Sequence, residues 1–302
     1  METRILETNV LRLEIQPEAG ASIVALGLRH EGDVVPVMRA TPREAVETGN
    51  SSEMASFVLA PFSNRLASAA FRFAGRTWQL EPNFAGGYAI HGCVRKRPWQ
   101  VAAASEEHID LRFVSSDFAD LDFPFPFRTD LRYSLRGDTL ACSLRLRNEG
   151  TQAMPAGFGF HPYFERSLLE PQENVELRMA TRAAYEGLCP EVAARPLQPA
   201  EDFRDSRSLP RKGFDTCFAG WDGRALLTWP GSGVRAEIEC DATLGHVILF
   251  TPPGESFFAL EPVSNANNGF NLLASGVADS GVVVLDPGEE MAATFRLRVA
   301  RD

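Results

Sequence analysis

Long apolar runs are missing from this chain of 302 residues, and none approaches the roughly 18 consecutive apolar residues that a membrane-spanning helix needs. We therefore expect no membrane partner. Basic residues are also in deficit, because 30 Lys and Arg face 40 Asp and Glu, which gives a formal net charge of −10. A surface of that sign repels phosphate backbones, so nucleic-acid binding is not expected.

Cysteines and export signals are equally sparse. The five cysteines are odd in number and widely spaced, and they include no CxxC pair, which favours free thiols over a disulfide framework. The first residues, METRILETNVLRLEI, carry Arg4, Glu7 and Arg12 and lack the apolar segment of a signal peptide. These features predict a cytoplasmic protein.

Motifs for several common chemistries are absent. The stretch GFGF at residues 157–160 begins like a dinucleotide-binding loop, but Pro162 follows and no strand–helix unit comes after it. No GxxxxGK[ST], GxSxG or HExxH motif occurs, and no two histidines have a metal-ligand spacing. Nucleotide, serine-nucleophile and zinc-protease chemistry therefore have no local support.

Hydrophobic alternation of period two is the dominant pattern that is present. Residues 129–150 alternate on both sides of Gly137-Asp138, and residues 225–240 alternate around a Pro-Gly-Ser-Gly turn, so both stretches predict β-hairpins. A third hairpin is expected to turn near Gly75, and residues 291–300 are expected to form a last strand.

Helical signals are few. Thr41, Pro42 and Glu44 are typical of an N-cap, a first helical position and a capping box, so we expect one short helix there. Residues 186–213 have the weakest pattern and predict a long loop with a helical turn. The many short strands, with 44% hydrophobic residues, predict an all-β fold of two large antiparallel sheets packed face to face. We expect one domain that spans residues 1–302.

The stretch GFGFHPYFER, residues 157–166, contains one of only five histidines. In an extended chain Phe158 and Phe160 point to one face, while the two glycines and His161 point to the other. Two missing side chains beside His161 predict a hollow that could hold a ligand, and Tyr163 returns to the same face. The alternative is a core histidine that is packed against aromatic rings and bonded to a carbonyl.

The stretch ESFFALEP places a carboxylate on a strand that is apolar on both faces. Phe257, Ala259 and Glu261 share one face, and Phe258 and Leu260 share the other. A carboxylate in such a strand must face a polar cavity or carry a large desolvation cost. We therefore interpret Glu261 as functional.

Three further polar motifs are candidates for ligand contacts. Asn64-Arg65 follows an apolar run, and an arginine fork matches paired oxygen acceptors such as sugar hydroxyls, although a surface ion pair is the alternative. His91 precedes a glycine and the basic triplet Arg95–Arg97, which either draws in an anionic substrate or forms a solvated loop. Asp215 is either a ligand-binding residue or a turn residue.

These five motifs, in this order, resemble the aldose 1-epimerase (galactose mutarotase) family. The resemblance runs essentially end to end, from GASIVALGL near the amino terminus to LDPGEEMAATFRL near the carboxyl terminus. Its motifs are the N-R of Asn64-Arg65, the H-G after a hairpin, the H-x-Y-F that begins at His161, the D-x-x-F of Asp215, and the E-P of Glu261. Each motif alone is weak, but five in order are specific.

The resemblance implies a β-supersandwich fold and a set of roles. Glu261 would be the general base that takes the proton of the anomeric hydroxyl, and His161 the general acid that protonates the ring oxygen. Arg65, His91 and Asp215 would hold sugar hydroxyls. Opening a cyclic hemiacetal requires one base and one acid, which we expect on opposite sides of the C1–O5 unit. Nothing is oxidised or hydrolysed, so no cofactor and no metal are required.

Two departures from the family pattern leave the sugar open. The segment CVRKRPWQV is shorter than the glycine-rich loop of typical galactose mutarotases and is similar to the compact loop of more distant members, including those acting on hexose 6-phosphates. The segment VSNANNGFN after Glu261-Pro262 also differs. The sequence thus predicts a mutarotase for a free monosaccharide. The alternatives are a 1-epimerase for an anionic sugar that uses Arg95, Lys96 or Arg97, a sugar-binding protein without turnover, and a metal enzyme that uses His91, His161 and a carboxylate. The oligomeric state stays open.

Overall fold

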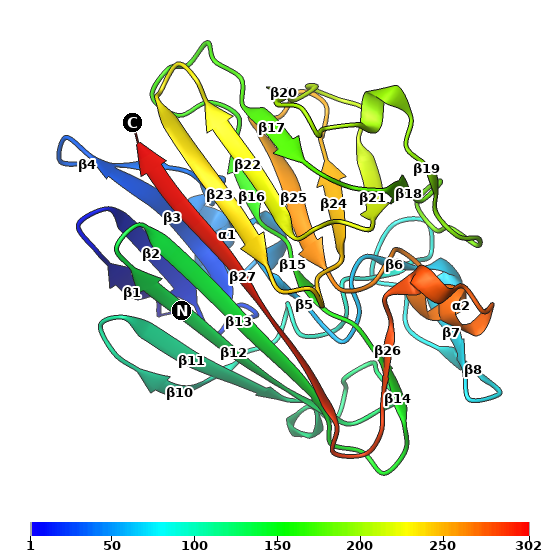
Figure 1. Cartoon of the computed structure of the whole chain (residues 1–302). Coiled ribbons are helices and arrows are strands. Elements are labelled where there is room, and N and C mark those ends of the chain that lie inside the picture. Colours follow the sequence, from blue (N-terminus) through cyan, green and yellow to red (C-terminus); the bar gives the residue numbers. More distant parts are fainter. Residues whose placement is uncertain (1, 302) are drawn as a thin grey trace.

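The longest strands follow the alternating stretches of the sequence. In this computed structural model, which describes residues 2–301, β12 (Phe127–Arg136) pairs with β13 (Thr139–Asn148) in the register Arg136↔Thr139. The apolar positions on both strands are buried, from Leu131 to Leu146. The predicted hairpin is therefore confirmed, and Figure 1 shows it beside the carboxyl-terminal strand.

The larger of two extended sheets contains nine strands among the described residues, all paired antiparallel. It includes the second predicted hairpin and the predicted last strand, both of which are confirmed. In spatial order its strands are β10 (Gln100–Ala104), β11 (His108–Val114), β12, β13, β27 (Glu290–Arg301), β23 (Val234–Cys240), β22 (Arg224–Trp229), β17 (Glu176–Met179) and β20 (Arg207–Ser208).

The second sheet contains eight shorter strands and carries most of the polar residues that the sequence singled out. Seven of its strands form one path, and β16 (Tyr163–Glu165) pairs with β25 outside that path. In spatial order the path is β19 (Arg195–Pro196), β18 (Ala183–Ala184), β21 (Asp215–Ala219), β24 (His246–Phe250), β25 (Phe257–Val263), β15 (Gly159–Phe160) and β5 (Val58–Leu59).

The two sheets pack face to face over a shared hydrophobic core. Phe160 of the smaller sheet lies 5.7 Å, between ring centroids, from Phe295 of the larger sheet, and Phe258 and Leu260 belong to the same buried cluster. A separate cluster containing Ala259, Ile248 and Tyr163 covers the opposite face of the smaller sheet. The smaller sheet is thus buried on both faces, as Glu261's strand predicted, and the β-supersandwich expectation is confirmed.

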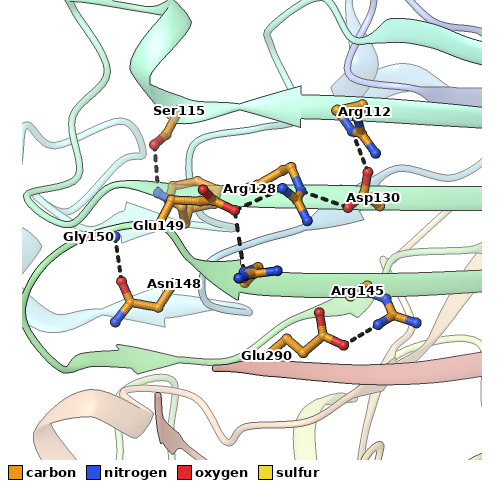
Figure 2. Close-up of polar contacts among 11 residues, drawn as sticks. Arg112, Ser115, Arg128, Asp130, Arg145, Asn148, Glu149, Gly150 and Glu290 are labelled. Atoms are coloured by element: carbon orange, nitrogen blue, oxygen red, sulfur yellow. Dashed lines mark hydrogen bonds and ion pairs between the residues drawn. The ribbon is translucent and has the colours of Figure 1, made fainter. Parts of the chain in front are cut away.

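The outer face of the larger sheet is covered by charged side chains instead. Figure 2 shows Arg128 between Asp130 and Glu149, with nitrogen–oxygen distances of 3.0 and 2.9 Å. Arg112 approaches the same Asp130 from the neighbouring strand at 2.6 Å. Such partly exposed pairs add little to stability, but they keep this face polar while the opposite face packs on the core.

Smaller elements surround the two sheets. The structure describes two α-helices and five 3₁₀ turns in residues 2–301, and none of its helices is long and apolar enough to cross a membrane. The remaining strands are β1 (Arg4–Glu7), β2 (Leu11–Gln16), β3 (Ser22–His30), β4 (Asp33–Pro36), β6 (Arg65–Leu66), β9 (Ala89–Ile90), β7 (Ala70–Phe73), β8 (Arg76–Gln79), β14 (Met154–Ala156) and β26 (Val283–Leu285). The helices are α1 (Arg43–Thr48) and α2 (Gly269–Ala274), and the turns are η1 (Ser51–Glu53), η2 (Ala67–Ala69), η3 (Ser115–Asp117), η4 (Pro199–Glu201) and η5 (Ala278–Ser280).

Three local predictions can be compared with these elements. The hairpin around Gly75 is confirmed by the β7–β8 pair, and the loop at 186–213 contains the predicted helical turn as η4, with the short β19 and β20. The short helix after residue 42 is confirmed as α1, but the predicted cap is wrong. Pro42 is the N-cap, and the Thr41 hydroxyl donates to the Val24 carbonyl oxygen at 2.5 Å, so it does not cap the helix.

Candidate active site

One cavity of about 370 Å³ opens on the face of the smaller sheet that is turned away from the larger one. Its volume lies at the lower end of the range of roughly 300–1,000 Å³ typical of small-molecule sites. All seven residues that the sequence suggested for a sugar site line it, namely Asn64, Arg65, His91, His161, Tyr163, Asp215 and Glu261. The fold thus brings together residues that are spread over most of the chain.

The alternation of side chains along each strand explains how the smaller sheet contributes three of these residues to the cavity. Tyr163 on β16 lies opposite Ala259 on β25, and Glu261 lies two positions further along the same strand. Asp215 begins β21 and shares the face of Cys217, which is buried in the cluster on this side of the sheet. Because side chains of a strand alternate between faces, all three polar groups point to the cavity side.

The His161 ring is fixed by two aromatic neighbours. Its centroid lies 4.5 Å from that of Phe57 and 4.5 Å from that of Tyr163. Its backbone N–H donates to the Phe57 carbonyl oxygen at 2.9 Å, which ties the segment between β15 and β16 to residues preceding β5. The ring therefore has a defined orientation, and its Nε2 points to Glu261 Oε1 at 3.2 Å.

The glycines that precede His161 have a different role from the one predicted. A Cβ atom at Gly157 would lie 2.1 Å from Asn265 Oδ1, and one at Gly159 would lie 2.6 Å from the Pro262 carbonyl oxygen. The space beside these glycines is therefore filled by the segment 262–265 and is not a hollow for a ligand. The prediction of a hollow at this point is wrong, and the cavity is instead bounded by His161 itself and by more distant segments.

The placement of the carboxylate relative to the imidazole also differs from expectation. Both side chains are nearly inaccessible, at 6% exposure for His161 and 2% for Glu261, and they are in direct contact. A sugar cannot lie between them, so the expectation of groups on opposite sides of the C1–O5 unit is wrong. Adjacent groups can nevertheless address both oxygens from one side, because O1 and O5 are bonded to the same carbon.

The environment of this pair favours the uncharged form of each group. Burial raises the pKa of Glu261 well above its usual 4.5, and the nearby negative charge of Asp215 raises it further. Burial lowers the pKa of His161 well below 6.5, and the positive charges of Arg39 and Arg95 act in the same direction. Two groups at 3.2 Å titrate as a unit. The pair therefore holds one shared proton between the low pH at which the imidazole also becomes protonated and the higher pH at which the carboxyl ionises.

Arg65 is oriented by two oxygen acceptors. Its Nη2 donates to Asp215 Oδ2 at 3.1 Å, and its Nη1 donates to Asn64 Oδ1, also at 3.1 Å. The Asn64 oxygen accepts the Arg65 backbone N–H as well, at 2.8 Å, so it is committed to positioning the arginine. Arg65 and Asp215 therefore present a paired donor and acceptor at the cavity wall, as recognition of sugar hydroxyls requires.

His91 enters the cavity because the following glycine lets two segments touch. Gly92 has φ +66°, and a Cβ atom there would lie 1.8 Å from the Ala60 carbonyl oxygen. His91 itself has φ +63°, an uncommon left-handed conformation for a residue with a side chain. Its ring lies edge-on to that of His161, with centroids 5.0 Å apart. Burial and the charge of His161 lower its pKa well below 6.5.

Unpartnered polar atoms concentrate around the same cavity. Four side-chain atoms of lining residues are buried without a hydrogen-bond partner among the described residues: Arg65 Nε, His91 Nδ1, His161 Nδ1 and Glu261 Oε2. Such atoms are rare in folded proteins and call for an explanation. Their number here supports a site for a polar ligand. In the part of the chain that the structure describes, no three His, Cys, Asp or Glu side chains are arranged to hold a metal ion.

The basic triplet divides into three environments. Arg95 is buried in the cavity wall, and Lys96 lies exposed at the cavity rim. Arg97 points elsewhere and forms a two-pronged pair with Asp120, at 3.0 and 2.9 Å. Only the first two residues of the triplet can therefore reach a ligand in this cavity.

Several lining residues were not predicted from the sequence. Phe57 packs on His161, Ser52 accepts a hydrogen bond from Arg95, and Asn83 and Phe84 lie in the loop before β9. An aromatic residue in the apolar run SFVLAPF has the appearance of a core residue, so Phe57 gave no signal. Phe84 did carry one, because it precedes two glycines just before the predicted His91 motif, and the structure leaves it 47% exposed.

Comparison with known proteins places this chain in a family context. The family described as aldose 1-epimerase matches residues 11–298. The uncharacterised protein YphB of Escherichia coli K12 is 28% identical over 280 residues, which cover 88% of this chain and 90% of that protein. A crystal structure of a candidate aldose 1-epimerase from Escherichia coli K12 is 25% identical and superposes with a TM-score of 0.84 over 100% of this chain and 99% of the other. A galactose mutarotase-like protein from Clostridium acetobutylicum, 18% identical, has the same fold, with a TM-score of 0.83 over 99% and 95% of the two chains.

Proposed function

Since this chain belongs to the aldose 1-epimerase family, we propose that it interconverts the α and β anomers of a monosaccharide by opening and reclosing the sugar ring. One observation carries the proposal: a buried carboxyl and a buried imidazole lie 3.2 Å apart at a cavity of small-molecule size. The reaction needs one base and one acid within reach of two oxygens on the same carbon, and this pair supplies both.

Ring opening transfers two protons and breaks one carbon–oxygen bond. Glu261, in its ionised form, takes the proton of the anomeric hydroxyl, and the O1–H electron pair becomes the second bond of the aldehyde. The C1–O5 electron pair moves to the ring oxygen, which accepts a proton from His161. Rotation about C1–C2 and the reverse transfers close the ring with the other configuration. No electrons are gained or lost overall.

The proton count of the pair is the same before and after ring opening. The ion-pair form, ionised Glu261 with protonated His161, becomes the neutral form, protonated Glu261 with neutral His161. Burial favours the neutral form, since it raises the pKa of the carboxyl and lowers that of the imidazole. The reverse transfers on ring closure restore the ion-pair form. Before ring opening, the contact at 3.2 Å lets the proton pass directly from Oε1 to Nε2, so the neutral pair reaches the ion-pair form without solvent.

The remaining cavity residues orient the sugar. Arg65 and Asp215 offer a fixed donor and acceptor to hydroxyl groups, and His91 offers a further ring nitrogen. Positioning by such groups converts binding energy into a reactive geometry. The exposed ring of Phe84, at the cavity edge, offers an apolar surface to the C–H face of a sugar.

The test is a screen of freshly dissolved α anomers by polarimetry or NMR, with galactose, glucose, arabinose and glucose 6-phosphate as probes. We expect the protein to accelerate equilibration of at least one sugar, also after exhaustive chelation of metals. Binding of a sugar whose anomers still equilibrate at the background rate would instead indicate a sugar-binding protein without turnover. Activity that disappears on chelation and returns with added metal would indicate a metal enzyme.

A further inference from the structure

The second ring nitrogen of His161 has no hydrogen-bond partner among residues 2–301. Its Nδ1 atom is buried and unpartnered, whereas its Nε2 atom faces Glu261. In many catalytic histidines the second nitrogen donates to a carbonyl or carboxylate oxygen, and this bond fixes the orientation of the ring. Here the orientation depends instead on the neighbouring rings of Phe57 and Tyr163, whose centroids each lie 4.5 Å from that of His161.

Arg39 packs on one of these two rings. Its guanidinium carbon lies 3.7 Å from the centroid of the Tyr163 ring and 4.7 Å from that of the Phe257 ring. The backbone N–H of Arg39 also donates to the Tyr163 carbonyl oxygen at 3.0 Å. Tyr163 lines the cavity, whereas Arg39 is not among the lining residues. Arg39 therefore acts on the site only through Tyr163 and through its charge.

The Arg39 side chain is held by carbonyl oxygens and not by a carboxylate. It donates to the Ser52 carbonyl oxygen at 3.1 Å and to the Met54 carbonyl oxygen at 2.5 Å. The carboxylates of Glu53 and Glu165 are near enough to attract its charge, but in the described part of the chain neither forms an ion pair with it. A positive charge without a direct counter-ion is therefore fixed beside the Tyr163 ring.

This charge is close enough to affect the imidazole. The charged and titratable groups around the His161 ring are Glu261, His91, Tyr163, Arg39, Arg65 and Arg95. Burial has the largest effect in lowering the pKa of His161, and among the charges that of Arg39 has the largest effect, ahead of Arg95. The two distances to the Tyr163 ring place the guanidinium carbon within about 8 Å of the His161 centroid, where charges in a protein still interact appreciably.

We propose that Arg39 is a positioning residue of the acid–base pair, which holds the Tyr163 ring against His161 and hinders the pair from taking up a second proton. The inference rests on the proposed function and adds to it a residue outside the cavity. A pair with one proton reaches its ion-pair form by a single proton shift. A pair with two protons has no base left to accept the proton of the anomeric hydroxyl. Arg39 thus extends the activity of the pair to lower pH.

The experiment compares pH profiles of kcat/KM for mutarotation by the wild-type protein and Arg39→Gln. The acid limb should move to higher pH in the variant, because the imidazole accepts the second proton more readily without the nearby cation. The alkaline limb should move less, since the charges that act on Glu261 are those of Asp215 and Arg65. At a pH on the wild-type acid limb, the rate relative to each protein's own maximum should be roughly threefold or more lower in Arg39→Gln.

Two further substitutions separate the charge of Arg39 from its packing. Arg39→Lys keeps a cation beside the Tyr163 ring and should return the acid limb toward its wild-type position. The matched control is Arg76→Gln, which removes a guanidinium 4.3 Å from the centroid of Trp78, outside the cavity lining, and should leave both limbs unchanged. If Arg39→Gln does not fold, Arg39→Met replaces it, because methionine keeps an apolar side chain against the two rings.

The titration of His161 tests the same point without any sugar. The chain has five histidines, so isotope-labelled histidine gives a small set of NMR signals, and the signal that is missing in His161→Asn is assigned to His161. We expect this signal to titrate at higher pH in Arg39→Gln than in the wild-type protein. In Arg39→Lys it should titrate close to the wild-type position.

The outcomes separate this inference from the proposed function. Acid limbs and His161 titrations that coincide in the wild-type protein and Arg39→Gln would overturn the inference and leave the mutarotase activity in place. A rate loss that is uniform over pH in both Arg39→Gln and Arg39→Lys would indicate that Arg39 only supports the Tyr163 segment, and would also overturn it. Background rates for every sugar would overturn the proposed function, and the NMR titration would still decide whether Arg39 acts on His161.

Discussion

His161 Nε2 lies 3.2 Å from Glu261 Oε1, and this contact joins the segment after β15 to the middle of β25. It places a carboxyl and an imidazole, each nearly inaccessible, at the wall of the same cavity. Neither group has an ordinary pKa there, because burial disfavours the charge on both. The contact therefore determines how many protons the pair holds during the proposed reaction, and it determines how activity and stability depend on pH.

The pH dependence of kcat/KM follows from the number of protons that the His161–Glu261 pair holds. The active pair holds one proton, so activity falls when a second proton is added and when the last one is lost. Burial lowers the pKa of His161, so the second proton is added only well below pH 6.5; burial raises the pKa of Glu261, so the last proton is lost only well above pH 4.5. We therefore expect the acid limb of the profile to lie below 6.5.

The measurement is a pH profile of the enzymatic rate, with the acid- and base-catalysed background subtracted at each pH. In His161→Asn the base Glu261 must be ionised without help from the imidazole, so the acid limb should move up to the raised pKa of Glu261. An acid limb at or above 6.5 in the wild-type protein would mean that His161 titrates like a solvent-exposed imidazole, against the environment described above.

The free energy of unfolding should depend on pH in part through the titration of Glu261. Its carboxyl has a raised pKa in the folded state, so the stabilisation it contributes is fully present below about pH 4.5 and is lost as pH rises through the folded pKa. Glu261→Gln removes this titration. We expect the variant to gain stability relative to wild type as pH rises, by at most about 1.4 kcal/mol per pH unit for one proton.

Denaturant unfolding of both proteins at several pH values between about 5 and 8 would check this expectation. Because His161 titrates together with Glu261, the same comparison in a His161→Asn background removes the contribution of the imidazole from the difference. A stability difference that is constant over this range would show that Glu261 titrates alike in the folded and unfolded states.

Gly92 should be far less replaceable than Gly75, although both have positive φ. An alanine Cβ at Gly92 would lie 1.8 Å from the Ala60 carbonyl oxygen, so the bonded contact between the two segments would have to open and move His91. Gly75 also has positive φ, but a Cβ there meets nothing within 4 Å. We expect Gly75→Ala to cost only the roughly 1–2 kcal/mol of a left-handed alanine.

Gly92→Ala should therefore lower the melting temperature clearly more than Gly75→Ala, and should raise the KM for the sugar. Comparing thermal unfolding and mutarotation kinetics of the two variants checks both parts. Equal stability losses would indicate that the loop around His91 relaxes freely and that the close approach to Ala60 is not required.

The fold could be predicted because strand alternation leaves a strong local signal. The hairpins at Gly75 and Gly137 and the last strand follow directly from it. The N-cap at Thr41 was predicted wrongly because its hydroxyl has a competing partner, the Val24 carbonyl oxygen, which is distant in sequence. Tertiary hydrogen bonds of this kind leave no local pattern.

In the candidate site, too, local sequence patterns revealed some features, whereas features that depend on tertiary contacts were missed. Ordered motifs identified residues that the structure brings to one cavity, Glu261 and Arg65 among them. The hollow beside His161 was predicted wrongly, because a glycine shows that a side chain is missing but not what fills its space, which here is Asn265. Phe57 was overlooked, since only the folded chain shows an apolar residue in contact with a catalytic candidate.

The most direct test of the account is the mutarotation rate of the preferred sugar, measured by polarimetry or NMR for the wild-type protein and Glu261→Gln. The account predicts that the glutamine variant still binds the sugar but loses roughly 3 kcal/mol or more of transition-state stabilisation, seen in kcat. His161→Asn should show a comparable loss. A rate close to that of wild type in Glu261→Gln would contradict the assignment of this carboxyl as the base.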